Sequence, residues 1–421
     1  MLMVKPSADF VCLTFALFRI GAPIILIDPG MGYRNLLRCI EGVAPDFLIG
    51  IPKAIIFRTL FRKPFRSVKK SFCCGKLFGS AAWDIRQKRN KKLPEVPLFK
   101  PDRDALAAII FTTGSTGPPK GVRFEHAIFS TQLDYISSFY KIGSDDIDQP
   151  GFPLFGLFSI ALGACAVIPD MDPTKPAQVD SEKFVDSIQK YGVTYSFGSP
   201  AIWNNVARYC DEQKIVCKSL RKVLMAGAPV PGRLIKRVYQ MLPEYAFVYT
   251  PYGATECLPI VSCEGREIVG ETWDKTRSGR GTCVGRPLPG VEVRIVEPSD
   301  VPFETIDRCT QLPPHEIGEI IVKGPVVTRA YENNESETRF SKIRENDAIW
   351  HRIGDIGYID EKGRLWFCGR KAHRVKSAEG VMYTIQCEAI VNEHPDVLRS
   401  ALVGVEGNSH YEYPVLIVEM K

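Results

Sequence analysis

A glycine-rich segment that follows an apolar run constrains this chain more than any other stretch. The apolar run is Ala105–Phe111, and residues 112–121 then read Thr-Thr-Gly-Ser-Thr-Gly-Pro-Pro-Lys-Gly. Glycine lets the backbone turn tightly and approach a ligand closely. Hydroxyl groups and turn N–H groups can surround phosphate oxygens, and a lysine adds a positive charge. The composition therefore predicts a phosphate-binding loop.

The spacing within this segment differs from that of the common phosphate loop. That loop, Gly-x-x-x-x-Gly-Lys-Ser/Thr, requires glycine directly before the lysine, whereas Pro119 precedes Lys120 here. A flexible surface loop rich in glycine and hydroxyl residues is the alternative interpretation of the same composition.

Alternating helix-like and strand-like segments predict an α/β fold. A buried helix at Phe10–Ile20 precedes an all-apolar strand at Pro23–Ile27, and a helix at Asn35–Gly42 precedes a strand at Asp46–Ile51. Apolar strands of this kind are typical of parallel sheets that are covered on both faces. A second round of helices and strands follows at Ala127–Tyr140, Val193–Phe197, Ile202–Glu212, Lys222–Met225, Arg233–Met241 and Ala246–Tyr249.

Three strands of the second round are each followed by a turn that contains glycine or proline. These turns are Gly198-Ser199-Pro200, Gly227-Ala228-Pro229 and Pro251-Tyr252-Gly253. Ligands of open α/β sheets bind at the carboxyl ends of the strands. We therefore expect the three turns to form walls of one site.

The pattern changes after Gly281 and predicts the division of the chain into domains. We expect a large domain at 1–368, with two α/β layers at 1–280, a β-rich subdomain at 281–345 and a closing loop and hairpin at 346–368. A charged linker at the hinge and an incomplete small α+β domain would occupy 369–421. Because the chain opens in mid-pattern and its last domain is unfinished, we expect it to be truncated at both ends.

Bulk composition excludes several classes of protein. Of 421 residues, 45% are hydrophobic and 24% charged, which are ordinary globular values. The net charge of +6 is too mild to predict nucleic-acid binding. Thirteen cysteines without C-x-x-C spacing indicate neither zinc nor a disulfide framework, so we expect a reducing cytoplasm. The apolar start, 10–27, is interrupted by Arg19, Gly21 and Pro23, which argues against a membrane span.

The stretch Phe57–Lys70 places six basic residues among three phenylalanines and contains no acid. One interpretation is peripheral contact with an anionic membrane surface. The other is a solvated, poorly ordered excursion that continues through Arg86–Lys92.

The glycine-rich loop is the first of four stretches that occur in a fixed order. It is followed by Tyr252–Glu256, then by Trp350–Asp355, and then by Gly369–Arg370. We expect a turn to carry the carboxylate of Asp355. This order resembles the signature of the adenylate-forming enzymes: acyl-CoA synthetases, adenylation domains and luciferases. The resemblance covers Phe10–Val418. Three further stretches look most like the olefin-biosynthesis β-lactone synthetases: Leu26–Gly32, Ile49–Ala54 and Gly369–Val375.

The resemblance implies a role for each matching residue. Lys120 would act in catalysis and hold the β- and γ-phosphates of ATP, together with Thr112, Thr113, Gly114, Ser115, Thr116 and Gly117. Thr255 would contact the α-phosphate, and Glu256 would bind Mg²⁺, both as catalytic residues. Asp355 would bind the ribose hydroxyls with help from Arg370. The adenine pocket would consist of Gly227, Ala228, Pro229, Tyr252 and Gly253.

The resemblance also implies an activity. A carboxylic acid, expected to be a long-chain β-hydroxy acid, becomes an acyl-adenylate at the expense of Mg-ATP and then a β-lactone. The run Phe152–Ile168 would line the acyl channel with Phe197 and Gly198. The alternatives are a long-chain fatty acid–CoA ligase and a truncated, non-catalytic nucleotide-binding remnant. Assembly with thiolase-like and hydrolase-like enzymes is the implied partnership.

Three positions depart from the family's pattern. Gly156 stands where many members have histidine after Pro-Leu-Phe, and Ala372 stands at the usual Asp or Lys hinge position. The family's C-terminal adenylation lysine lies beyond the last residue, Lys421, which has no surrounding motif. We therefore assign Lys421 no catalytic role.

Overall fold

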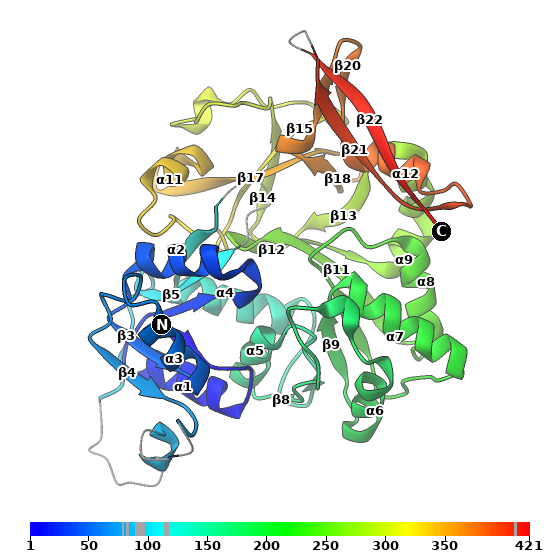
Figure 1. Ribbon diagram of the computed structural model, residues 1–421. Coiled ribbons are helices and arrows are strands. Elements are labelled where there is room, and N and C mark those ends of the chain that lie inside the picture. The colour runs from blue at the N-terminus through cyan, green and yellow to red at the C-terminus, as the bar shows by residue number, and fades with distance from the viewer. Residues whose placement is uncertain (78–79, 81–83, 89–96, 113–117, 408–410) are drawn as a thin grey trace. The chain divides into compact units, whose positions relative to one another are not determined.

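The computed structural model describes residues 1–77, 80, 84–88, 97–112, 118–407 and 411–421 (Figure 1). The chain divides into two compact units. The first unit contains Met1–Thr131 and Thr328–Thr338, and the second contains Gln132–Val327 and Arg339–Lys421. The α/β class predicted from the sequence is confirmed, whereas a domain boundary at 368–369 stays a prediction.

The first unit contains two small sheets with the strand orders β1-β3-β4 and β2-β5-β6. Apolar strand β2 pairs in parallel with β5, which pairs in turn with β6 in antiparallel fashion. The helix at the start begins where the Ser7 side chain accepts a hydrogen bond from the Phe10 N–H, as an N-cap does. The elements are β1 Leu2–Met3, α1 Ala8–Arg19, β2 Ile24–Ile27, α2 Tyr33–Val43, β3 Phe47–Gly50, α3 Pro52–Leu60, β4 Lys70–Cys73, β5 Leu106–Thr112 and β6 Lys120–Glu125.

The basic stretch Phe57–Lys70 is built into this unit. Its first residues belong to α3, and Phe65 and Val68 are buried at 2% and 5% exposure. The Arg58 guanidinium donates hydrogen bonds to the Ser71 hydroxyl and the Val68 carbonyl. The prediction of a poorly ordered excursion is therefore wrong for 57–70, because these anchors fix it. Part of the expected continuation, 89–92, lies outside the described residues.

The second unit is organised around one continuous hydrogen-bonded sheet. Along its path the strand order is β14-β15-β17-β18-β13-β12-β11-β10-β9-β7-β8, with β16 paired to β17. Strands β11, β10, β9, β7 and β8 run parallel, and the others pair in antiparallel fashion. The strands are β7 Ile147–Asp148, β8 Cys165–Ala166, β9 Tyr195–Gly198, β10 Lys222–Met225, β11 Phe247–Ala254, β12 Cys257–Glu264, β13 Thr282–Pro287, β14 Glu292–Val296, β15 Gly318–Lys323, β16 Lys342–Glu345, β17 Ala348–Ile359 and β18 Leu365–Arg370.

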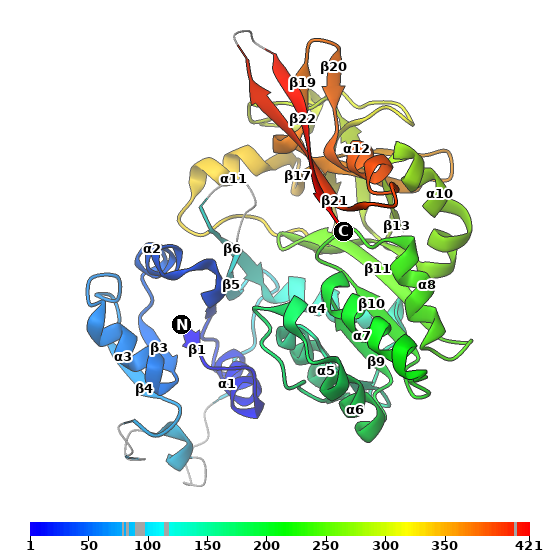
Figure 2. The same ribbon diagram turned by 45° about the vertical axis from the view of Figure 1, so that its right-hand side comes forward.

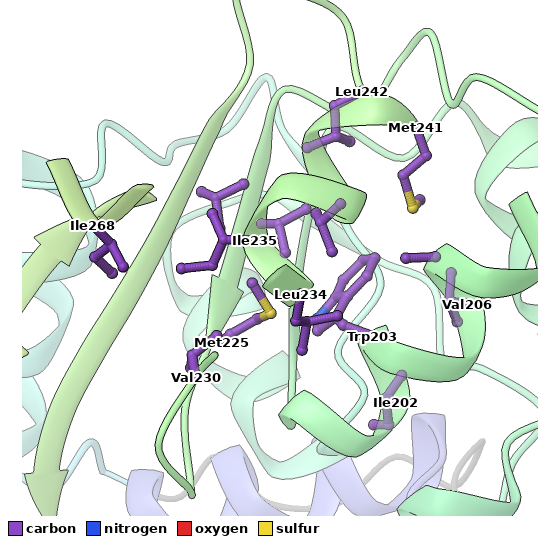
Figure 3. Close-up of a cluster of buried hydrophobic side chains, with 14 of the residues drawn as sticks. Ile202, Trp203, Val206, Met225, Val230, Leu234, Ile235, Met241, Leu242 and Ile268 are labelled. Carbon is purple, nitrogen blue, oxygen red and sulfur yellow. The ribbon is translucent and has the colours of Figure 1, made fainter. Parts of the chain in front are cut away.

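Helices cover the parallel part of this sheet. In Figure 2, α7 lies beside β9 and β10, and α6 and α8 pack against α7. Their buried side chains form a large apolar core with those of the strands, and Trp203 and Ile235 in it are fully buried (Figure 3). The helices of this unit, with two that cross between the units, are α4 His126–Ser138, α5 Gly156–Ala161, α6 Ser181–Tyr191, α7 Pro200–Gln213, α8 Gly232–Gln240, α9 Gly265–Glu267, α10 Trp273–Lys275, α11 Glu335–Ser341 and α12 Thr384–Val391.

The C-terminal part differs from the expected charged linker. After β18 the chain forms a short hairpin from β19 (Val375–Ser377) and β20 (Gly380–Met382). It ends in a second hairpin, β21 (Val397–Glu406) with β22 (Glu412–Met420). Part of the expected linker, the polar segment 375–382, thus forms a hairpin whose pairing satisfies its backbone groups, and a hinge at 369 stays a prediction.

No helix within the described ranges is long and apolar enough to cross a membrane.

The core of the second unit predicts a strong effect of truncating Ile235. We expect Ile235→Ala to lower the free energy of unfolding by about 2–5 kcal/mol, because lost burial and a residual cavity both act at this site. Ile417→Ala is the matched control, since Ile417 is 57% exposed and surface changes cost about 0.5 kcal/mol. Urea-induced unfolding checks both variants, and equal losses would contradict the assigned core.

Candidate functional site

Three strand ends meet at one edge of the parallel sheet in the second unit. Phe197 of β9 pairs with Leu224 of β10, which pairs with Tyr249 of β11. The segments that follow these strands therefore leave the sheet at the same edge, as predicted from the sequence. They border a cavity of about 600 Å³.

Eight of the sixteen predicted site residues line this cavity. Lys120 and the glycine-rich loop belong to the first unit. Glu256 does not line the cavity. The predicted residues that do line it are Gly227, Ala228, Pro229, Tyr252, Gly253, Thr255, Asp355 and Arg370. They come from positions as distant in the sequence as 227 and 370.

The turn Gly227-Ala228-Pro229 supplies an open wall of the cavity. Gly227 has a φ of +95°, in the left-handed region that side chains rarely adopt, and a Cβ there would meet nothing within 4 Å. All three residues are exposed to the cavity or solvent. The turn therefore leaves room against which a flat ring could lie.

The segment Pro251-Tyr252-Gly253 is strand rather than the expected turn. Strand β11 continues to Ala254 because β12 pairs with it in antiparallel fashion, with a register shift between Tyr252 and Ala254. The chain reverses only at Thr255 and Glu256. A Cβ at Gly253 would lie 2.4 Å from the Cys257 carbonyl oxygen, so the tight reversal requires glycine at this position.

A buried carboxylate is the electrostatic centre of the cavity wall. Asp355 is 3% exposed, and its Oδ2 accepts a hydrogen bond of 2.6 Å from the Tyr252 hydroxyl. Its Oδ1 lies 2.7 Å from Nη1 of Arg370, an ion pair that does not reach hydrogen-bond geometry. Oδ1 therefore keeps acceptor capacity for a ligand hydroxyl.

Burial sets the protonation of this carboxylate. Burial of Asp355 raises its pKa to about 6, although the Arg370 charge and the hydrogen bond from Tyr252 act in the opposite direction. The nearby charge of Glu256 adds to the rise. Burial, and then the charge of Asp355, also raise the pKa of the Tyr252 hydroxyl well above its usual range, so Tyr252 stays a donor.

Asp355 lies on a strand, in contrast to the predicted turn. It belongs to β17, and its partner in β18 is Arg370. The turn prediction is wrong because β17 runs on through this position: Asp355 pairs with Arg370 of β18, although Gly354, with a φ of +80°, lies in an irregularity of the pairing with β15 between Arg352 and Ile356. Trp350 and Arg352 of the same motif are buried away from the cavity, and Arg352 pairs with Glu319 at 2.8 Å.

The glycine-rich loop belongs to the first unit. Thr112 ends β5 and pairs with Lys120 at the start of β6, so the loop connects two adjacent antiparallel strands. Thr113, Gly114, Ser115, Thr116 and Gly117 lie outside the described residues. Phosphate binding by this loop stays a prediction.

Lys120 is held by residues that the sequence did not indicate. Its Nζ lies 2.5 Å from Oε2 of Glu337 and 5.5 Å from the ring centre of Tyr331. Neighbouring Arg123 pairs in the same way with Glu332 at 2.5 Å. More than 200 positions separate these partners, so no local spacing signal could have found them.

Aromatic side chains form the apolar part of the cavity. Phe155 stacks on Phe197 with ring centres 4.3 Å apart and also lies near Phe152 and Phe158. All four rings border the cavity. Of the residues predicted to line an acyl channel, Phe152, Phe155, Phe158 and Phe197 thus border the same cavity as Asp355, whereas Gly198 and the rest of the run to Ile168 do not; the channel itself stays a prediction.

No group of three or more His, Cys, Asp or Glu side chains that could hold a metal ion occurs within the described part of the chain. The thirteen cysteines, all of them in described positions, are free.

These features define an adenylate-forming enzyme, and the comparisons agree. The chain matches the family "AMP-binding enzyme" over residues 1–332 and belongs to that family. It is 42% identical to the olefin beta-lactone synthetase of Xanthomonas campestris pv. campestris, over 100% of this chain and 75% of that protein. It is also 42% identical to that of Stenotrophomonas maltophilia, over 99% of this chain and 76% of that protein.

Solved structures share the fold. The amide bond synthetase McbA from Marinactinospora thermotolerans matches with a TM-score of 0.80 at 23% identity, over 100% of this chain and 78% of that chain. The O-succinylbenzoate coenzyme A synthetase of Bacillus subtilis in complex with ATP and magnesium ion matches with a TM-score of 0.77 at 22% identity, over 99% of this chain and 78% of that chain.

The buried Asp355 carboxyl predicts a specific pH dependence of stability. Its pKa in the folded state, about 6, exceeds the value of 3.8 for a free carboxyl. The folded state therefore binds the proton more tightly, and this group's contribution to stability is lost as the pH rises from about 4 to about 6. With 1.36 kcal/mol per pKa unit, the loss is about 3 kcal/mol.

Asp355→Asn cannot ionise and should lack this loss. We expect its free energy of unfolding, relative to wild type, to rise by up to about 3 kcal/mol between pH 4 and pH 7. Asp360→Asn is the control of opposite sign: burial alone would raise the pKa of Asp360, but hydrogen bonds from Trp366 and Arg364 hold it below its usual value. Urea unfolding at both pH values measures the difference, and parallel curves for Asp355→Asn and wild type would contradict the shifted pKa.

Proposed function

We propose that this protein activates a long-chain β-hydroxy acid as an acyl-adenylate with ATP and then closes it to a β-lactone. The observation that carries the proposal is the buried Asp355 carboxylate beside an apolar, aromatic-lined cavity of about 600 Å³. One cavity can thus receive a nucleoside hydroxyl and an acyl chain. The 42% identity to two olefin beta-lactone synthetases supports the β-lactone product.

Asp355 and its two partners orient the nucleotide in this proposal. Oδ1 of Asp355 accepts from the ribose hydroxyls, while Tyr252 and Arg370 keep the carboxylate in place. The Gly227–Pro229 turn receives the adenine ring. Fixing the nucleotide in this way lowers the entropic part of the barrier, which is the main contribution of positioning to catalysis.

The chemical steps balance without a further reactant. The substrate carboxylate attacks the α-phosphorus of ATP, the bond to the bridging oxygen breaks, and pyrophosphate leaves. The β-hydroxyl oxygen then attacks the activated carboxyl carbon, the bond to AMP breaks, and the hydroxyl proton passes to the solvent or to AMP. Thr255 holds the α-phosphate, and Lys120 with the loop 112–117 neutralises the departing phosphates.

Glu256 would hold Mg²⁺ together with phosphate oxygens. A single carboxylate with substrate phosphates and waters is a usual Mg²⁺ environment, and the half-buried Glu256 beside Thr255 fits it. The ion would neutralise charge on the phosphates when bound.

Contacts with other partners stay predictions. Leu60 and Phe61 are 72% and 40% exposed beside Arg62 and Lys63, an arrangement compatible with an anionic membrane surface. Assembly with thiolase-like and hydrolase-like enzymes rests on the family resemblance.

The activity is tested by incubating the chain with ATP, Mg²⁺ and a 2-alkyl-3-hydroxy acid. We expect acid-dependent ATP–pyrophosphate exchange, with β-lactone and AMP detected by mass spectrometry. Asp355→Ala should lower kcat/KM for ATP by about 10- to 100-fold, because a hydrogen bond to a charged group contributes about 1.5–3 kcal/mol. Asp274→Ala, whose side chain is 91% exposed, is the control.

Two results would contradict the proposal. If coenzyme A is added and an acyl-CoA thioester forms, while no β-lactone forms with or without coenzyme A, the protein is an acyl-CoA ligase. ATP binding without pyrophosphate exchange would indicate a non-catalytic nucleotide-binding protein.

A further inference from the structure

A second buried carboxylate borders the cavity at some distance from the nucleotide edge. Asp148 on β7 is 1% exposed and lines the cavity. It pairs with Tyr195, the first residue of β9, whereas Gly198 ends that strand at the edge where Gly227 lies. Three residues of strand span about 10 Å. The proposed function puts the reacting carboxyl group beside the nucleotide at this edge, so Asp148 lies about 10 Å along the cavity from it.

Asp148 adjoins an aromatic and aliphatic part of the cavity wall, and Asp146 is the other carboxylate whose charge acts on it. Tyr195 belongs to a buried cluster with Tyr140, Ile142 and Leu224, and Phe197 packs against it. All of these side chains also border the cavity. A carboxyl group in such a wall contributes nothing to binding a plain alkyl chain, and its desolvation is costly.

Two hydroxyl groups support one side of this carboxyl group. The Ser159 hydroxyl of α5 donates a hydrogen bond to Oδ2 of Asp148. The Tyr195 hydroxyl lies 2.6 Å from the Ser159 oxygen. The other oxygen, Oδ1 of Asp148, is buried and has no hydrogen-bond partner among the described residues. A buried polar atom without a partner costs about 1–3 kcal/mol, which a ligand group can recover.

The protonation of Asp148 narrows the choice of ligand group. Burial raises the pKa of Asp148 to about 7, although the hydrogen bond from Ser159 acts in the opposite direction. Near neutral pH both forms are therefore present. The ionised form accepts a hydrogen bond at Oδ1, and the protonated form can donate one. A hydroxyl group satisfies both forms, a carbonyl group only the protonated one, and a methylene group neither.

We propose that Asp148, supported by Ser159 and Tyr195, forms a subsite that binds a hydroxyl group carried on the acyl chain, remote from the reacting carboxyl group. The inference rests on the proposed function, because it takes the cavity to be the acyl site. The hydroxyl is distinct from the β-hydroxyl that closes the lactone, since the β-carbon is only two bonds from the carboxyl carbon. The substrate class is thus a long-chain acid with an additional hydroxyl group along the chain.

The test compares acids that differ only in this hydroxyl group. Titration calorimetry with the full chain and AMP, which replaces ATP so that no acyl-adenylate forms, measures Kd for dodecanoic acid and for its monohydroxylated positional isomers. We expect one isomer, or two adjacent ones, to bind about tenfold more tightly than the parent acid, equivalent to about 1.4 kcal/mol. Sites built for a hydroxyl group discriminate strongly against analogues that lack it.

Three variants assign the preference to the subsite. Asp148→Leu should abolish the preference for the hydroxylated isomer while the parent acid still binds. Asp148→Asn, which keeps both hydrogen-bonding capacities in a similar shape, should retain most of it, and Ser159→Ala should reduce it. Asp274→Leu is the control outside the cavity, and thermal melting establishes that each variant is folded.

The outcomes separate this inference from the proposed function. If the parent acid binds and no isomer binds better, the hydroxyl subsite is wrong and the acyl cavity stands; a bound water on Oδ1 would give this result. If the preference persists in Asp148→Leu, another group is responsible and the assignment to Asp148 is wrong. If no acid binds, the acyl cavity itself is wrong and both proposals fail. Should Asp148→Leu not fold, the wild-type series still tests the hydroxyl preference, and Ser159→Ala tests its assignment to this subsite: an unreduced preference in Ser159→Ala would contradict it.

Discussion

The hydrogen bond between Tyr252 and Asp355 is the constraint on which the architecture of the site depends. In the sheet, β18, β13 and β12 lie between β11, which carries Tyr252, and β17, which carries Asp355. Four strand spacings in a flat sheet would place them about 19 Å apart, yet their side chains meet at 2.6 Å. The sheet must therefore curl, and the register shifts in β11, β13 and β17 supply the bends. The cavity lies inside this curl.

Burial of the Asp355 carboxylate by itself destabilises the folded state, and buried carboxylates with shifted pKa values are typical of functional sites. Burying Asp355 raises its pKa to about 6, and the Arg370 ion pair only partly offsets the burial. The fully buried core around Trp203 and Ile235 provides the rigidity that tolerates this cost. A carboxylate held between a tyrosine hydroxyl and a guanidinium has one orientation, and a hydroxyl-bearing ligand meets it without rearrangement.

The sequence predicted those features that depend on local pattern. Apolar runs such as Lys222–Met225 are strands at the predicted residues, and the three strand ends meet as the parallel-sheet rule requires. The order of the motifs predicted that Tyr252, Asp355 and Arg370 share one site. The failures concern long-range pairing: β11 extends through Pro251–Gly253 because β12 pairs with it, and Glu337 reaches Lys120 across more than 200 residues. No local signal contains such information, nor does it reveal the partnerless oxygen of Asp148.

We propose that Asp355 receives the ribose of a nucleotide, and a crystal structure of the chain with AMP tests this placement. Both ribose hydroxyls should lie within hydrogen-bond distance of the Asp355 carboxylate, with the adenine ring against Gly227–Pro229. The Tyr252 and Arg370 contacts to Asp355 should persist in the complex. AMP bound elsewhere, with the Asp355 carboxylate still contacting only Tyr252 and Arg370, would contradict it.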